Sequence, residues 1–371
     1  MTRSLTRREV LGALGLGALA ALPRAASGAP SFPKGAIIRT LLKDFNPKDL
    51  GGGPTLFHEH MSFTPDFMPR WMEASRAVAL TRNPAAAATV PPLPAPAAPP
   101  PGEKYFLEDA DLISDEMTKA KADGLACIVD GGHSDMGRRI GFLREISQRS
   151  GLPIVAGGGF YSQPFYPAEI KTMSEDQILA ALIKQTETDP VGVFGEIGSW
   201  DEITDDERKV FRAVGRAQVA TNLPIFTHTG IPGRSALEQL DILEKAGVKP
   251  DRIVIGHLGN LTDPKVEVHK AICKRGAFVG FDRQGGPGDV RQVPMVVSLI
   301  EAGYEGNLMF ASDLSASNQL KKNGGGGYAK TVTVFVPKLR EAGVKDDVLH
   351  GILVDNPRRF LSFVPKKPRP A

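Results

Sequence analysis

Short apolar segments alternate with longer amphipathic segments along most of the chain. The apolar segments are nearly continuous, as strands of a parallel sheet covered by helices are. They lie at residues 55–60, 125–132, 153–161, 191–198, 224–230, 252–259, 277–282 and 307–313. Helix-like segments separate them, several ending at glycine, at residues 109–124, 175–188, 206–221, 235–247 and 294–303.

Eight such repeats favour a closed barrel over an open doubly wound sheet. The first strand is not followed by the GxGxxG turn with which a dinucleotide-binding sheet holds phosphate. Barrels of this kind run to about 250 residues or more as one domain. The pattern therefore predicts an α/β fold, a (β/α)8 TIM barrel, as a single domain over residues 37–363.

A tract rich in proline and alanine at residues 84–102 interrupts the pattern. Proline excludes a regular helix or strand there, so the tract is predicted to be a loop insertion. It follows the first strand, where a barrel carries the loops of its catalytic face. Two roles remain open: a lid over an active site, or a solvated and partly disordered insertion.

Residues 1–29 have the composition of a signal peptide. A basic start that contains Arg7 and Arg8 precedes a short Gly, Ala and Leu-rich stretch and a set of small residues. The paired arginines resemble a twin-arginine signal, which implies the twin-arginine export machinery as a partner and a periplasmic or secreted protein. The apolar stretch is shorter than the roughly 20 residues of a membrane span, so we expect no stable membrane anchor. A disordered leader with a chance arginine pair is the alternative.

Composition and charge exclude little else. The chain has 371 residues, 42% of them hydrophobic, and a net charge of only +3, so a nucleic-acid partner is not expected. Its two cysteines fall in a predicted strand, at Cys127, and in a predicted helix, at Cys273. We expect buried free thiols rather than a disulfide or a metal site, because neither cysteine has a CxxC partner.

Six residues of types that commonly bind metal ions lie at the ends of predicted strands. They are His58, His60, Glu196, His228, His257 and Asp313. In a parallel barrel the carboxyl ends of the strands meet at one mouth, where catalytic groups are kept. Alternate residues of a strand share a side, so the HxH pair presents two imidazoles together. Four imidazoles and two carboxylates predict a pair of divalent ions, and therefore a hydrolase.

Each of these residues also has an alternative explanation, and the HxH pair of His58 and His60 taken alone could be a chance or structural pattern. A lone buried Glu196 would be costly, which favours a carboxylate that bridges both ions, but it could instead pair with an arginine or a backbone amide. Asp313 could ligate the first ion and accept a proton as a catalytic residue, or it could cap a helix. His228 and His257 could ligate the second ion, or be core histidines with satisfied hydrogen bonds.

The motifs together resemble a known family. FHEH, GEIG, FTHTG, IGHLGN, GFDR and FASD, in this order, are similar to those of the phosphotriesterase family of the amidohydrolase superfamily. The resemblance covers residues 37–363. It implies a TIM barrel with two divalent ions, usually Zn²⁺ with Mn²⁺, Co²⁺ or Fe²⁺ as alternatives. It also implies that His58, His60 and Asp313 hold one ion and that His228 and His257 hold the other, and it suggests a homodimer.

One position departs from the best-known members. They bridge the ions with a carboxylated lysine, and Glu196 stands at the matching position here. Glutamate there, and the segment GGGGYAKTVTVFVPKLREAGV after Asp313, resemble the branch of phosphotriesterase homology proteins. We therefore expect a bridging hydroxide to attack an ester-type substrate: a lactone first, an amide or another carboxylic ester second, and an organophosphate triester third. An inactive exported binding protein and a mononuclear, deaminase-like enzyme are the alternatives.

Three further residues are candidates for substrate binding. Tyr161 matches a position that lines the family's pocket and could orient a carbonyl oxygen. His133 could contact substrate or pack in the mouth. Arg283 and Asp282 resemble a pair that forms an ion pair at the rim. Other residues of these types are assigned to the surface or to packing: His269 and His350 to helix surfaces, and Trp71 and Trp200 to core or rim.

Overall fold

The computed structural model describes residues 30–82, 104–231, 233–261, 263 and 265–370. The predicted signal peptide at residues 1–29 and the whole proline-rich tract at residues 84–102 lie outside the described residues, so both stay predictions. Within the described part of the chain, no helix has the length and apolar character that crossing a bilayer requires.

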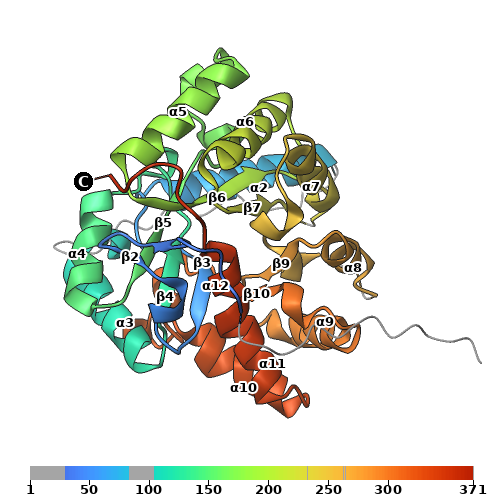
Figure 1. Ribbon diagram of the computed structural model, residues 1–371. Helices are drawn as coiled ribbons and strands as arrows, with labels where there is room; N and C mark the ends of the chain where they lie inside the picture. Colours follow the sequence, from blue (N-terminus) through green and yellow to red (C-terminus); the bar gives the residue numbers. More distant parts are fainter. Residues whose placement is uncertain (1–29, 83–103, 232, 262, 264, 371) are drawn as a thin grey trace, which may run out of the picture.

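Eight parallel strands form the centre of the molecule (Figure 1). In chain order and in spatial order they are β3 (Thr55–Glu59), β4 (Cys127–Asp130), β5 (Ile154–Gly158), β6 (Val191–Ser199), β7 (Ile225–Thr229), β8 (Ile253–Ile255), β9 (Phe278–Phe281) and β10 (Leu308–Phe310). Every strand residue is buried, as expected of strands covered on both faces. The predicted TIM barrel is confirmed.

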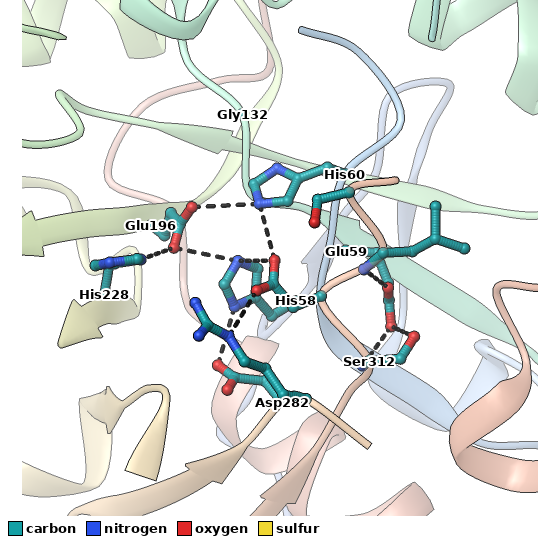
Figure 2. A network of polar contacts seen from close by, with 12 residues as sticks. His58, Glu59, His60, Gly132, Glu196, His228, Asp282 and Ser312 are labelled. Atoms are coloured by element: carbon teal, nitrogen blue, oxygen red, sulfur yellow. Dashed lines mark hydrogen bonds and ion pairs between the residues drawn. The ribbon is translucent and has the colours of Figure 1, made fainter. Parts of the chain in front are cut away.

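Strands β10 and β3 meet through side chains as well as backbone. The Asp313 amide donates to the carbonyl of His58 at 3.2 Å. The carboxylate of Glu59 accepts from the Ser312 amide at 2.7 Å, the Ser312 hydroxyl at 2.6 Å and the Leu314 amide at 2.8 Å (Figure 2). Burial raises the pKa of Glu59 to about 7 in spite of these donors. Glu59 thus fixes the last strand end against the first.

Helices surround the strands (Figure 1). They are α2 (Phe67–Arg82), α3 (Ala110–Ala122), α4 (Ile140–Ser150), α5 (Glu175–Thr188), α6 (Asp205–Thr221), α7 (Ala236–Lys245), α8 (Glu267–Lys274) and α9 (Asp289–Glu301). After β10, a π-helical turn at Thr331–Phe335 leads to α10 (Val336–Glu341), α11 (Asp346–His350), a second π-helical turn at Gly351–Asp355 and α12 (Asn356–Leu361). The five predicted helices are confirmed, whereas α2 and α4 were not predicted.

The termini of the described barrel are tied together at its outside. Strands β1 (Ile38–Arg39) and β2 (Asp44–Phe45) form a small antiparallel pair, and Ile37 pairs with Phe363 across an isolated bridge.

Helices α5 and α6 each begin with a capping box, in which Ser174 and Thr204 are the capping residues. These local signals are readable in the sequence and explain why both helices start where they were predicted to start.

Two predictions on buried residues had opposite outcomes. Cys127 on β4 and Cys273 on α8 are both buried and free, as expected. The surface assignment of His269 was wrong: its side chain is fully buried, its ring stacks on Phe281 with centroids 5.6 Å apart, and its Nε2 lies 2.9 Å from the Leu258 carbonyl. The inward face of the short helix α8 packs against β9, and His269 lies on that face. The surface assignment of His350 is confirmed.

Candidate metal centre

Glu196 lies at the centre of the six predicted residues. One carboxylate oxygen lies 3.2 Å from Nε2 of His60. The other lies 3.3 Å from Nε2 of His58, 2.9 Å from Nδ1 of His228 and 3.5 Å from Nε2 of His257. Figure 2 shows the carboxylate between the rings of His58, His60 and His228. The structure therefore brings together four imidazoles from β3, β7 and the end of β8 around one carboxylate from β6, with no arginine among these contacts.

Asp313 completes the cluster on the side of His60. Its Oδ1 lies 3.2 Å from Nε2 of His60 and 3.8 Å from Nε2 of His58. Asp313 and His257 both follow strand ends in the left-handed region, with φ of 48° and 61°. Non-glycine residues there are uncommon and gather at functional sites, where the local backbone aims a side chain. The carboxylate of Asp313 faces these imidazoles, which fits a metal ligand rather than the helix-cap alternative.

The chemistry of these donors fits divalent ions. Among the described residues, three sets of three place ligand atoms within 4.8 Å of one another: His58, His60 and Asp313; Glu196, His228 and His257; and His58, His257 and Asp282. The first two sets correspond to the two predicted ion sites. Nε2 of His58 is buried, and no described residue forms a hydrogen bond with it. Imidazole and carboxylate are the ligands of catalytic zinc sites, and a shared carboxylate suits two neighbouring ions. The residues present therefore fit the predicted pair of ions.

The electrostatics of the cluster favour cations in the same place. Burial opposes ionisation of Glu196, yet the imidazoles of His58 and His228 hold the pKa of this carboxyl well below its usual range. Burial also works against charging His60, but hydrogen bonds to Asp313 and Glu196 raise the pKa of its imidazole to about 9. The carboxylates thus retain protons on His58 and His60, whereas burial and the charge of His257 lower the pKa of the His228 imidazole to about 4. Metal binding must displace those protons.

Asp282 orients one imidazole of each predicted ion site, His58 and His257. Its Oδ2 lies 3.0 Å from Nδ1 of His58, and its Oδ1 lies 2.8 Å from Nδ1 of His257, whose backbone amide also donates to it at 3.0 Å. The expectation that Asp282 pairs with Arg283 at the rim was wrong. Consecutive side chains after a strand point to different sides. Asp282 is buried under the ligands, and Arg283 instead donates from Nε to Asp313 at 3.2 Å.

A cavity of about 320 Å³ opens onto the cluster. The predicted substrate residues Tyr161 and Arg283 line it, together with the aromatic rings of Phe67 and Trp71. The hydroxyl of Tyr161 accepts a hydrogen bond from Nε1 of Trp71 at 2.8 Å and lies 3.1 Å from Nδ1 of His228. Aromatic side chains and five of the six candidate ligands therefore line the same cavity.

His133 takes a different position. It is fully buried, and Nδ1 lies 3.4 Å from a carboxylate oxygen of Asp135. His133 is not among the residues that line the cavity. Within the described chain neither of its ring nitrogens has a hydrogen-bond partner. Its position corresponds to the packing alternative.

Several supporting residues escaped the sequence analysis. Asp130 at the end of β4 accepts from the amides of Met61 and Gly132, and Tyr328 donates to the carbonyl of His60 at 3.0 Å. A Cβ on Gly131 would lie 3.0 Å from the ring of His58, so glycine leaves room for the imidazole. The strand-end sequence VDGG was a usable signal for Asp130. Nothing in the local sequence marked Tyr328.

Comparison with known proteins decides the family. The model of the phosphotriesterase family matches residues 38–361, which include all six candidate ligands. The chain belongs to the phosphotriesterase family. As a member of this family it is a hydrolase of a metal-dependent class, and its ligand candidates are the residues described above.

Curated relatives in the phosphotriesterase family include N-acetyltaurine hydrolases. The human protein is 28% identical over 275 residues, which cover 69% of this chain and 78% of the relative. The zebrafish (Danio rerio) protein is 26% identical over 278 residues, with coverages of 69% and 78%. These relatives are named for cleavage of an amide, so the expected ester substrate is not confirmed.

Two solved structures share the fold. A phosphotriesterase homology protein from Escherichia coli, complexed with phosphate in its active site, is 27% identical with a TM-score of 0.70, and the match covers 85% of this chain and all of that one. A resiniferatoxin-binding protein from Rhodobacter sphaeroides is 28% identical with a TM-score of 0.73, with coverages of 88% and 94%. The predicted resemblance to phosphotriesterase homology proteins is confirmed.

Proposed function

We propose that this protein hydrolyses a small carboxylic amide with the help of two divalent ions held by His58, His60, Asp313, His228, His257 and Glu196. The observation that carries this proposal is the position of the Glu196 carboxylate, within 3.5 Å of a ring nitrogen of all four histidines and in the lining of a cavity. An amide now ranks above the lactone of the sequence-based order because curated relatives are N-acetyltaurine hydrolases. Zn²⁺ is the proposed ion, since imidazole and carboxylate suit it.

Two bound ions would lower the pKa of water toward neutrality and stabilise the negative charge that develops on the substrate oxygen. The chain supplies the groups around that chemistry. Asp313 is kept ionised because, against the effect of burial, its hydrogen bond to His60 and the charges of His58 and His257 hold the pKa of its carboxyl below the usual range. It can therefore accept the proton of the attacking water and pass it to the leaving amine.

Tyr161 is the proposed group that orients the substrate carbonyl. Burial and the charges of Glu196 and Asp313 hold the pKa of its phenol well above the ordinary value, so the hydroxyl keeps its proton. The hydroxyl already accepts from Nε1 of Trp71, so its own proton can go to His228, 3.1 Å away, or, when that imidazole holds an ion, to an acceptor in the cavity. Arg283 holds Asp313 from the other side and lines the same cavity.

Export by the twin-arginine machinery, a periplasmic or secreted location and a homodimer remain proposals. Fractionation of cells that express the full chain, with the Arg7 and Arg8 pair intact or changed to lysines, tests the first two. Sedimentation of the purified protein tests the third.

A substrate panel on zinc-loaded mature protein tests the proposed function, with metal content measured on the same sample. The panel holds N-acetyltaurine, a γ-lactone, an aryl acetate and a neutral aryl phosphotriester. We expect close to two ions per chain and the highest kcat/KM for the amide. Faster turnover of the phosphotriester than of the amide, lactone and acetate would contradict the proposal. Fewer than one ion per chain with no turnover after zinc or manganese addition would identify a binding protein.

A further inference from the structure

Lys330 is a buried cation with no partner in the described structure. It follows β10, its residue is only 5% exposed, and it lines the cavity above the metal ligands. Its aliphatic stem lies over two glycines: a Cβ would come within 2.8 Å of the stem at Gly285 and within 2.6 Å at Gly326. Across the described residues its ammonium group makes neither a hydrogen bond nor an ion pair. Burying an ammonium group without a partner is costly.

The carboxylates nearest Lys330 are engaged elsewhere. Glu59 accepts from Ser312 and Leu314, and Asp313 is bound by Arg283 and His60. Asp289 accepts from the Gly285 amide at 3.0 Å and from Nζ of Lys338 at 2.7 Å. Burial lowers the pKa of Lys330 while these three carboxylates oppose that effect. The ammonium group of Lys330 is therefore not paired with any of these three carboxylates, each of which already accepts hydrogen bonds from other groups.

Arg283 and Gln284, which follow β9 and Asp282, add unused donors to the same cavity. Gln284 is 1% exposed, and neither its buried amide nitrogen nor its buried amide oxygen has a hydrogen-bond partner among the residues that the structure describes. Arg283 uses Nε for Asp313 and leaves its other two guanidinium nitrogens without a hydrogen bond within the described chain. Its guanidinium lies 5.9 Å from the centre of the Trp71 ring. All three side chains line the cavity beside the metal ligands.

We propose that Lys330, Arg283 and Gln284 form a subsite for an anionic group, a carboxylate or a sulfonate, that the substrate carries at the end away from the scissile amide. This inference rests on the proposed amide hydrolysis. Two cations and an amide N–H offer charge-assisted hydrogen bonds to such a group, and the substrate anion would supply the partner that Lys330 lacks.

Three acetamides of matched chain length test the subsite on zinc-loaded mature protein. N-Acetyltaurine carries a sulfonate, N-acetyl-β-alanine a carboxylate, and N-acetylethanolamine a neutral hydroxyl. We expect kcat/KM for at least one anion to exceed that of the neutral compound by about 30-fold or more, mainly through a lower KM, since each buried charged hydrogen bond contributes about 1.5–3 kcal/mol. The two anions separate sulfonate from carboxylate recognition.

Lysine variants assign the preference to the proposed group. Lys330→Met should reduce the ratio of anionic to neutral kcat/KM at least tenfold, and Lys330→Arg should restore part of it. Lys322→Met is the matched control, because Lys322 is exposed on the same segment and its loss changes the net charge equally. Equal kcat/KM for anionic and neutral acetamides in the wild type overturns the proposal, as do equal ratios in Lys330→Met and Lys322→Met.

A binding measurement separates failure of the subsite from failure of the proposed function. If no acetamide is hydrolysed, amide hydrolysis is contradicted, and calorimetry with pentane-1-sulfonate, pentanoate and pentan-1-ol decides on the subsite alone. Tighter binding of an anion than of the alcohol in zinc-loaded wild type, reduced at least tenfold by Lys330→Met and unchanged by Lys322→Met, supports it. The same affinity in wild type and Lys330→Met overturns it.

Discussion

Oδ2 of Asp282 lies 3.0 Å from Nδ1 of His58, although 224 residues separate them in the chain. The second oxygen of the same carboxylate lies 2.8 Å from Nδ1 of His257. Because each Nδ1 is held in this way, each ring turns Nε2 toward Glu196. A single buried carboxylate therefore fixes one candidate ligand of each ion.

Replacement of Asp282 by asparagine should weaken binding of both ions. Loss of a carboxylate that orients a histidine ligand typically costs 10-fold to 100-fold in metal affinity. Competition with a chromophoric chelator measures this loss. Asp289→Asn is the control, because Asp289 is also a buried aspartate after β9 but bonds to Gly285 and Lys338 instead of to a histidine. Equal affinities of the two variants would show that Asp282 does not orient the ligands.

Replacement of Glu196 by glutamine should lower the metal content from about two ions per chain to one or fewer. The amide cannot neutralise the repulsion between two neighbouring cations as a shared carboxylate does. We expect kcat/KM for the best amide to fall by at least about 100-fold, and metal analysis of the same samples gives the stoichiometry. A variant that keeps the wild-type content would favour the mononuclear alternative.

Glu59 should contribute to the stability of the barrel. Its carboxylate accepts two backbone amides and one hydroxyl at the junction of β3 and β10, and glutamine in its place would turn an N–H group toward these donors. An unsatisfied buried donor costs about 1–3 kcal/mol, so Glu59→Gln should lower the free energy of unfolding by about that amount. Urea denaturation of metal-free protein measures it. Exposed Glu73→Gln should change stability by less than about 0.5 kcal/mol.

His269 should make the fold sensitive to acid. Burial lowers the pKa of its imidazole from the ordinary value near 6.5, so protonation favours the unfolded chain. Its stabilising contribution is therefore present above about pH 6.5 and is lost as the pH falls through the folded-state pKa. Urea denaturation of metal-free wild type and His269→Gln at pH 8, 6 and 5 measures this. The stability difference should shrink toward low pH by up to about 1.4 kcal/mol per unit, and a constant difference would contradict the assignment.

The two thiols should resist alkylation in the native protein. Burial raises the pKa of Cys127 and of Cys273 to about 12, so about one thiol in ten thousand is ionised at pH 8, and only the thiolate reacts. Iodoacetamide treatment followed by peptide mass spectrometry should find both cysteines unmodified in the native protein and both modified in urea. Rapid modification of either cysteine in the native protein would contradict its burial.

The candidate ligands at strand ends were predictable because the apolar pattern of the strands and the topology of the barrel both point to these positions. Apolar strands marked where each strand stops, and the barrel topology placed all carboxyl ends at one mouth. His58 and His60 followed from the alternation of side chains along a strand. Asp282 and Lys330 did not follow, since Asp282 reads as one half of a sequential pair with Arg283 and Lys330 as one lysine among many. Their roles depend on distances to residues far away in the chain.

The sequence by itself determined the barrel, the family and the set of six candidate ligands, because strand periodicity and motif order are properties of the chain. Only the tertiary structure decided that Asp282 holds His58 and His257, that Arg283 holds Asp313 and that His269 is buried. It also decided that Lys330 and Gln284 line the cavity without partners among the described residues. The physical reason is that orientation and burial are set by packing between strands and helices that local sequence does not encode.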